Sequence, residues 1–230
     1  MAYFSEQEMT RRLDHLKRCM EEKAVDAVLV TSVHNTLYYS NFWMIPWGRL
    51  QGLVIPREGE PVLIAPRNED DRPVRMIGEG SVFSDVRIYS DNTSAIDGWV
   101  GLAGEILGER GITTGRIGIE EDNVSVTLHK ALCAALTGAE LVEMGYSMMC
   151  EQMLKSEEEI TLIRNGAEIC DIGAQAFVDA LTEGVTEVQI ARAAVTAMEE
   201  EICRRFPDEE CDGTFCWAQS GLSTPRSHTR

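Results

Sequence analysis

Three consecutive residues, Trp47-Gly48-Arg49, could together bind a small charged molecule. The planar guanidinium of Arg49 can hold a carboxylate through two parallel hydrogen bonds. The indole ring of Trp47 offers an apolar wall, and its face attracts cations such as a guanidinium group. Because Ile45-Pro46 precedes the triplet and Gly48 interrupts it, the sequence favours an exposed loop over a strand interior. The alternative is a core tryptophan that stands next to a surface arginine.

The imidazole of His228 is the second group that could do chemistry. A histidine side chain ordinarily titrates near a pH of about 6.5, so it can take a proton from water and return it to a departing amine. His228 could therefore serve as a general acid and base. The alternative is a solvated residue close to the C-terminus.

We predict no metal site, no cofactor and no thiol nucleophile. The acidic runs 157–159 and 199–201 fall in helical patterns, where consecutive residues point in different directions, and this is typical of a solvated face. His15, His34 and His129 are expected to lack the partners at helical spacing that a zinc ion needs. The seven cysteines are scattered, contain no Cys-x-x-Cys and are expected to have no histidine partner, so we interpret them as reduced thiols.

Composition narrows the classes of function. The 230 residues include 38 acidic and 21 basic side chains, which give a net charge of −17, and 44% are hydrophobic. A chain this acidic repels phosphate backbones and anionic lipid, so we expect neither nucleic acid nor a membrane as partner. The apolar runs are too short to span a bilayer and the first residues lack the apolar core of a signal peptide, so we expect a cytoplasmic location.

Short strands alternate with amphipathic helices through about the first 150 residues, which predicts an α/β sheet flanked by helices. The first helix is expected to begin at a capping box formed by Ser5 and Glu8 and to end near Lys23. A tight turn at Gly59 is expected to join two strands into a hairpin. Strands are expected at 27–31, 50–55, 61–65, 82–89, 116–120 and 140–143, and further helices at 96–107 and 126–136.

The pattern becomes helical after about residue 153. Capping boxes that start at Ser156 and Thr186 are expected to open two helices, and Gly184 ends the first of them. We therefore predict two domains, 1–152 and 153–230. Two helices and one short strand bury too little surface to enclose a core, so we expect a second domain that is truncated within its fold. A tail packed on the first domain is the alternative.

Several stretches, taken together, resemble the creatinase branch of the creatinase/aminopeptidase superfamily, whose catalytic domain has the pita-bread fold. They occur in the family's order across nearly the whole chain. These stretches are Thr31-Ser32-Val33-His34-Asn35, Tyr38-Tyr39-Ser40-Asn41-Phe42, Trp47-Gly48-Arg49, Ile117-Gly118-Ile119-Glu120, Leu154-Lys155-Ser156 with Glu158, Ile163-Arg164, Ile172-Gly173, and Gln219-Ser220-Gly221 before His228.

The resemblance implies a creatinase/prolidase N-terminal domain followed by the first helices and strand of an incomplete α+β pita-bread domain. It implies an enzyme that hydrolyses a C–N bond of a guanidino acid such as creatine, and that yields sarcosine and urea. By the same resemblance His228 is the general acid and base. Trp47 and Arg49 stand where the family has a Phe-Gly-Arg stretch that reaches the partner subunit's active site, which implies a homodimer. Tryptophan in place of phenylalanine puts the identity of the substrate in question.

Two other functions stay open. The first is a metal-dependent Xaa-Pro peptidase or a related hydrolase of a small zwitterion, whose metal ligands in the superfamily lie beyond the position that matches His228. The second is a non-catalytic fragment for dimerisation and substrate gating. Apolar stripes that include Ile163 and Met198 are expected to be exposed on the two last helices, which predicts self-association. Tyr38 and Tyr39 are expected to be packing residues.

Overall fold

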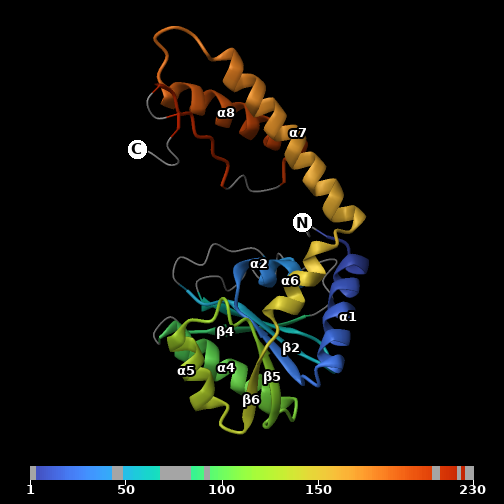
Figure 1. The fold of residues 1–230 in the computed structure, drawn as a ribbon. Helices are drawn as coiled ribbons and strands as arrows, with labels where there is room; N and C mark the ends of the chain where they lie inside the picture. Colours follow the sequence, from blue (N-terminus) through green and yellow to red (C-terminus); the bar gives the residue numbers. More distant parts are fainter. Residues whose placement is uncertain are drawn as a thin grey trace. The chain divides into compact units, whose positions relative to one another are not determined.

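Figure 1 shows the computed structural model of the chain, which describes residues 4–42, 49–67, 84–90, 94–208, 213–221 and 224–225. The chain divides into two compact units, Met1–Lys155 and Ser156–Arg230.

The first unit is an α/β domain. Its elements in chain order are α1 (Glu6–Glu22), β1 (Ala27–Val30), α2 (Val33–Ser40), β2 (Gly52–Pro56), β3 (Val62–Pro66), β4 (Asp85–Tyr89), α4 (Ala95–Glu109), β5 (Gly115–Ile119), α5 (Val126–Ala135), β6 (Ala139–Glu143) and α6 (Gly145–Met153).

The six strands form one mixed sheet in the order β4-β3-β2-β1-β5-β6, which confirms the predicted fold class. β2 is antiparallel to both of its neighbours, β1 and β3, and the pairings β3–β4, β1–β5 and β5–β6 are parallel. The antiparallel pair β2–β3 confirms the predicted hairpin, and Gly59 in its turn has a φ of 98°. All strands except β2 therefore end at one edge of the sheet, and β2 begins at that edge.

Helices cover both faces of this sheet (Figure 1). Side chains of β1 alternate between the two faces because successive residues of a strand point in opposite directions. Val28 and Val30 pack in a cluster with residues of α1, α2 and α6. Ala27 and Leu29 pack in a second cluster, which centres on the fully buried Trp99 of α4 and includes residues of α5. Each face of the sheet thus has its own apolar core.

Tyr38 and Tyr39 belong to the first of these clusters, which confirms them as packing residues. Tyr38 also stacks on the guanidinium of Arg12, which is fully buried and lies 4.0 Å from the ring centre. Glu8 neutralises Arg12 with a hydrogen bond of 2.8 Å. Burial opposes the ionisation of Glu8, but hydrogen bonds and charge from Arg11 and Arg12 outweigh it and lower the pKa to about 2. At the start of α1 the Ser5 hydroxyl accepts from the backbone N–H of Glu8, as predicted. The Glu8 carboxylate, which was expected to complete the capping box, instead binds Arg11 and Arg12.

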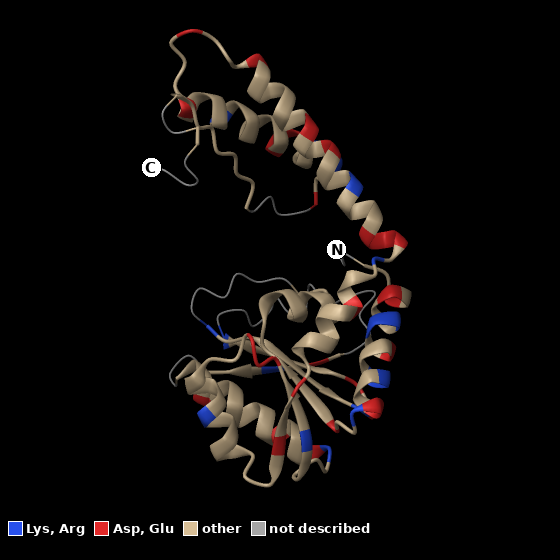
Figure 2. Ribbon diagram, in the orientation of Figure 1, with Lys and Arg blue, Asp and Glu red and all other residues tan. Residues whose placement is uncertain are grey.

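The second unit begins with two helices, α7 (Glu157–Asp179) and α8 (Glu187–Arg205), and both predicted capping boxes are present. The acidic first turn of α7 is red in Figure 2. The helices pack closely because Gly173 has no side chain: a Cβ atom there would lie 2.6 Å from the Cγ of Met198. Met198 is therefore buried, and its predicted exposure is wrong, whereas Ile163 is 55% exposed as expected. The sequence pattern could not show that the two helices face each other at this position.

In the parts of the chain that the structure describes, no helix has the length and apolar character needed to cross a membrane.

Candidate functional site

The edge of the sheet at which β1 and β5 end carries most of the polar residues singled out from the sequence. Thr31 and Ser32 follow β1, Glu120 follows β5, and Arg49 lies three residues before β2 begins. Open α/β sheets bind ligands at the carboxyl ends of their strands, in the crevice where neighbouring strands connect in opposite directions. This edge is therefore where a ligand site of the first unit is expected.

Glu120 fills the crevice between β1 and β5. It is only 1% exposed, and its carboxylate oxygens accept five hydrogen bonds. The backbone N–H groups of Thr31 and Ser32 donate to Oε2 at 2.5 and 2.9 Å. The hydroxyl of Ser32 and the amide of Asn35 donate to Oε1, each at 2.5 Å. Ser32 is the N-cap of α2, so a carboxylate of the protein itself occupies the helix end that could otherwise bind an anion.

The same network reaches α6. The amide of Gln152 donates to Oδ1 of Asn35, and the hydroxyl of Tyr39 donates to Oε2 of Glu151 at 2.8 Å. Burial raises the pKa of Tyr39 well above its usual value, and the charge and hydrogen bond of Glu151 act in the same direction. These contacts fix α2 and α6 against the end of the sheet. They make the Glu120 network a structural support of the edge, and a substrate would have to bind elsewhere on it.

Arg49 lies at this edge and outside the network. Its side chain is half-buried, and no ion pair or hydrogen bond joins it to a residue within the described ranges. The backbone that follows it is held firmly: the carbonyl of Leu50 accepts a hydrogen bond of 2.8 Å from the hydroxyl of Tyr89. Gly52 approaches β1 so closely that a Cβ atom would lie 2.0 Å from the carbonyl oxygen of Val30. A rigid strand end therefore carries a guanidinium that the described protein groups do not neutralise.

The other two predicted site residues, Trp47 and His228, lie outside the described residues. Of the three, the structure thus describes Arg49 alone. The structure does describe Gln219-Ser220-Gly221, the stretch that precedes His228 in the sequence. Ser220 donates to Oε1 of Glu187 through its backbone N–H at 2.5 Å and its hydroxyl at 2.8 Å. The first turn of α8 therefore anchors this stretch within the second unit.

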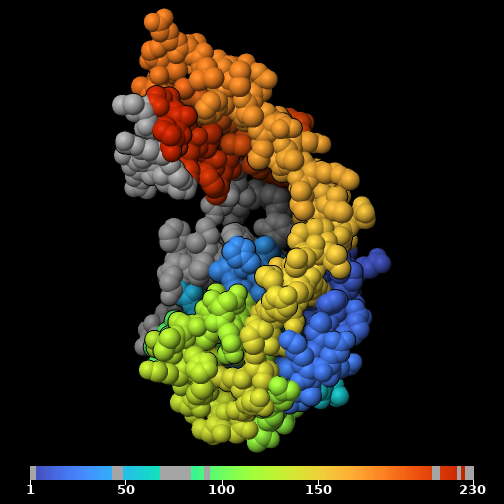
Figure 3. All heavy atoms as spheres, viewed as in Figure 1, coloured from blue at the N-terminus to red at the C-terminus, as the bar shows by residue number. Residues whose placement is uncertain are grey.

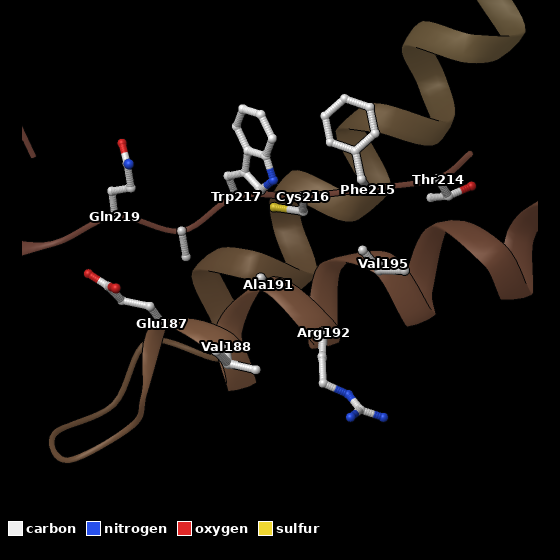
Figure 4. Close-up of a pocket in the computed structure, with 11 residues that line it drawn as sticks. Glu187, Val188, Ala191, Arg192, Val195, Thr214, Phe215, Cys216, Trp217 and Gln219 are labelled. Atoms are coloured by element: carbon white, nitrogen blue, oxygen red, sulfur yellow. The ribbon is translucent and has the colours of Figure 1, made fainter. Parts of the chain in front are cut away.

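An apolar groove of about 540 Å³ lies between α8 and the segment that leads to Ser220. The segment 213–221, red in Figure 3, lies against the helical pair. Figure 4 shows Phe215 and Trp217 on the same side of the segment, and their ring centres are 5.6 Å apart. Val188 and Val195 of α8 also line the groove. Most of the residues that line the groove are apolar; its two charged residues are Glu187, which binds Ser220, and Arg192.

One expectation about the cysteines is wrong. Cys133 and His129 stand four residues apart on α5, and the Sγ atom lies 3.7 Å from Nδ1 of the ring. The i, i+4 spacing was the signal that could have revealed this pair, and Cys19 and His15 have the same spacing on α1. Within the described residues no group of three or more potential metal ligands comes together.

Comparison with known families assigns the fold. The Creatinase/Prolidase N-terminal domain model matches residues 12–149, which is more than half of the chain. The chain belongs to the creatinase/prolidase superfamily. A creatinase from Bacillus sp. (strain B-0618) is 36% identical to this chain over 225 residues, which are 98% of this chain and 53% of the creatinase. The chain thus spans about half the length of that relative.

Solved structures agree with this fold. An Xaa-Pro dipeptidase from Bacillus anthracis has a TM-score of 0.67 at 18% identity, and the match covers 84% of this chain and 49% of the dipeptidase. A prolidase from Pyrococcus horikoshii OT3 has a TM-score of 0.64 at 20% identity over 83% of this chain and 49% of the prolidase. This chain therefore shares its fold with the dipeptidase and the prolidase.

Proposed function

We propose that this chain supplies an N-terminal domain, residues 1–152, and the start of a pita-bread catalytic domain, residues 153–230, to a creatinase-type hydrolase. The observation that carries the proposal is the 36% identity to a creatinase along 98% of the chain. The substrate is a guanidino acid such as creatine. Water attacks the guanidino carbon, the bond from that carbon to the sarcosine nitrogen breaks, and urea and sarcosine leave.

His228 moves the protons in this reaction. Its imidazole takes a proton from the attacking water and gives one to the departing sarcosine nitrogen, so that neither strong base nor strong acid is released. The position of His228 after the Gln219-Ser220-Gly221 stretch supports this role, and Glu187 anchors that stretch.

Arg49 and Trp47 bind the substrate. The guanidinium of Arg49 pairs with the carboxylate of the guanidino acid, and the Trp47 ring lies against its cationic end. The half-buried position of Arg49 at the strand edge, without an ion pair to a described residue, supports this assignment. The enzyme acts as a homodimer, in which the loop that holds both residues serves the active site of the other subunit.

The test uses the whole product of the reading frame that encodes residues 1–230, purified and incubated with creatine. Urea release is expected, and Arg49→Gln is expected to raise KM by about 10- to 100-fold, since a hydrogen-bonded ion pair is worth about 1.5–3 kcal/mol. Arg57→Gln is the matched control, because Arg57 follows the opposite end of β2 and pairs with Asp26 at 3.2 Å.

Each outcome decides between functions. Absence of urea from the whole product refutes the creatinase activity. Equal KM values for Arg49→Gln and Arg57→Gln would leave the activity standing and refute the role of Arg49. A loss of folding by Arg49→Gln is recognised from its thermal melt, and Arg49→Lys then tests the same point because it keeps the charge and loses the planar fork.

A second candidate is a metal-dependent hydrolase of Xaa-Pro dipeptides. The apolar groove beside Ser220 favours it, because a proline ring is apolar and small enough for about 540 Å³. Incubation of the whole product with Gly-Pro and Mn²⁺ separates the two functions. Release of proline without release of urea from creatine would establish the second candidate.

A further inference from the structure

We propose that Tyr89 is a positioning residue for substrate binding, because its hydroxyl holds the backbone that carries Arg49. The inference rests on the proposed function, since Arg49 is the group that we expect to bind the carboxylate of the substrate. The hydroxyl of Tyr89 donates a hydrogen bond of 2.8 Å to the carbonyl oxygen of Leu50, the residue that follows Arg49. Tyr89 is the last residue of β4 and is only 4% exposed, so its side chain reaches across β3 from inside the fold.

The backbone of the sheet cannot provide this hydrogen bond. In the antiparallel pairing of β2 with β3, Gly52 stands opposite Ile64. The same register, continued by two residues, places Leu50 opposite Pro66. Proline has no backbone N–H, so Pro66 cannot donate to the carbonyl of Leu50. Tyr89 stands opposite Pro66 in the parallel pairing of β3 with β4, and its hydroxyl takes the place of the backbone donor that the proline lacks.

Helix α4 holds both the tyrosine ring and the start of β2. A Cβ atom on Gly98 would lie 2.9 Å from Cδ2 of the Tyr89 ring, so the helix backbone contacts the ring directly. A Cβ atom on Gly52 would lie 3.2 Å from Cζ2 of Trp99, which is fully buried in the same helix. The helix therefore fixes the donor and also the strand that follows the acceptor.

The direction of the Arg49 side chain depends on this support. Within the described ranges no ion pair or hydrogen bond orients its guanidinium, so its direction is set by the backbone that carries it. A guanidinium holds a carboxylate through two parallel hydrogen bonds, which need a defined direction of approach. A hydrogen bond that fixes the neighbouring peptide group therefore reduces the entropy that Arg49 loses when substrate binds.

The first test is a double-mutant cycle in the whole product of the reading frame, with creatine as substrate. Tyr89→Phe removes the hydroxyl and keeps the ring, and we expect KM to rise about threefold to tenfold while kcat changes by less than about twofold. In the Arg49→Gln background the same substitution should leave KM unchanged, because the group that Tyr89 positions is gone. A KM that rises equally in both backgrounds, or that does not rise in the parent, would overturn the proposal.

Tyr39→Phe is the matched control, because the buried Tyr39 also donates one hydrogen bond of 2.8 Å, but to Glu151 of α6. It should leave KM unchanged even where its thermal melt falls as far as that of Tyr89→Phe. Gly98→Ala presses a methyl group against the Tyr89 ring and should raise KM without removal of the hydroxyl. Gly101→Ala meets open space on the same helix and should not. A rise in KM of the same size in either control would count against a specific role of Tyr89.

A measurement without substrate separates this inference from the proposed function. Backbone relaxation in nuclear magnetic resonance of the 230-residue chain reports the order parameters of the Arg49 and Leu50 amides, which for a rigid strand end are about 0.85. Tyr89→Phe should lower them to below about 0.7, and Tyr39→Phe should leave them unchanged. Lowered order parameters without urea release from the whole product would refute the creatinase activity and keep Tyr89 as the support of Arg49. Unchanged order parameters in Tyr89→Phe would overturn the proposal, whatever the activity.

Discussion

Glu120 offers a direct test of what holds together the sheet edge at which β1 and β5 end. Replacement by alanine would remove the acceptor of five hydrogen bonds from a site that is 1% exposed. The side chains of Ser32 and Asn35 can find other partners or water, but the backbone N–H groups of Thr31 and Ser32 would stay buried without an acceptor. Removal of one partner from such a buried charged network costs about 3–5 kcal/mol.

Replacement by glutamine should cost less. One amide oxygen can still accept from the two backbone N–H groups, but the amide NH₂ then meets the Ser32 hydroxyl and the Asn35 amide, both of which donate to Glu120 now. Loss of the charge also weakens the remaining bonds by about half. We expect Glu120→Gln to cost about 2 kcal/mol and Glu120→Ala about 4 kcal/mol.

Urea unfolding followed by far-ultraviolet circular dichroism measures both costs. Hydrogen exchange of peptides from β1 and β5 assigns any loss to the first unit. A cost of 4 kcal/mol corresponds to a fall in Tm of about 10 °C for a unit of this size. Glu121→Gln is the control, because Glu121 is the exposed neighbour and should change stability by less than about 0.5 kcal/mol. If the free energy of unfolding of Glu120→Ala differs from that of the parent as little as that of the control does, the network does not support the edge.

Two further predictions concern α1 and the start of β2. The pKa of Glu8 is about 2 in the folded chain, below its unfolded value, so its contribution of roughly 2 kcal/mol is present above about pH 4.5 and is lost as the pH falls towards 2. Glu8→Gln should therefore destabilise the chain at pH 7 in urea unfolding and make almost no difference near pH 2; an equal effect at both would refute the ion pairing. Gly52→Ala places a Cβ atom against the backbone of β1 and should cost about 3 kcal/mol, whereas Gly101→Ala, with open space around it in α4, should stabilise by about 0.5–1 kcal/mol. If the two substitutions shifted Tm in the same direction, the close approach of Gly52 to β1 would be contradicted.

Local patterns were enough to predict most elements of the first unit. Short runs rich in apolar residues placed its six strands within a few residues of their observed positions, and the turn at Gly59 identified the hairpin. The helix α6 (Gly145–Met153) was not among the predicted elements. Its stability comes from tertiary contacts, among them the Met148 side chain in the core and the bond from Tyr39 to Glu151, which no local pattern encodes.

The site was harder to predict for the same reason. Arg49 could be singled out because its residue type and loop context are local properties. The partnership of Glu120 with Ser32 joins residues 88 positions apart, and only the parallel pairing of β1 with β5 brings them together. The pair of Cys133 and His129 is the opposite case: its spacing was visible in the sequence, but the contact needed a helix with both side chains exposed.

The placement of Glu120 has a consequence for where a substrate can bind in the first unit. In many α/β sheets the helix that follows a central strand presents its free N–H groups to an anionic ligand. Here the carboxylate of Glu120 already accepts from the backbone N–H groups of Thr31 and Ser32 at the start of α2, so a second anion at that point would meet a negative charge. Recognition of an anionic group at this edge then needs a cation outside the crevice. Arg49 at the start of β2 is such a cation, and this explains why a loop residue, and not the helix end, is the group that we expect to bind substrate.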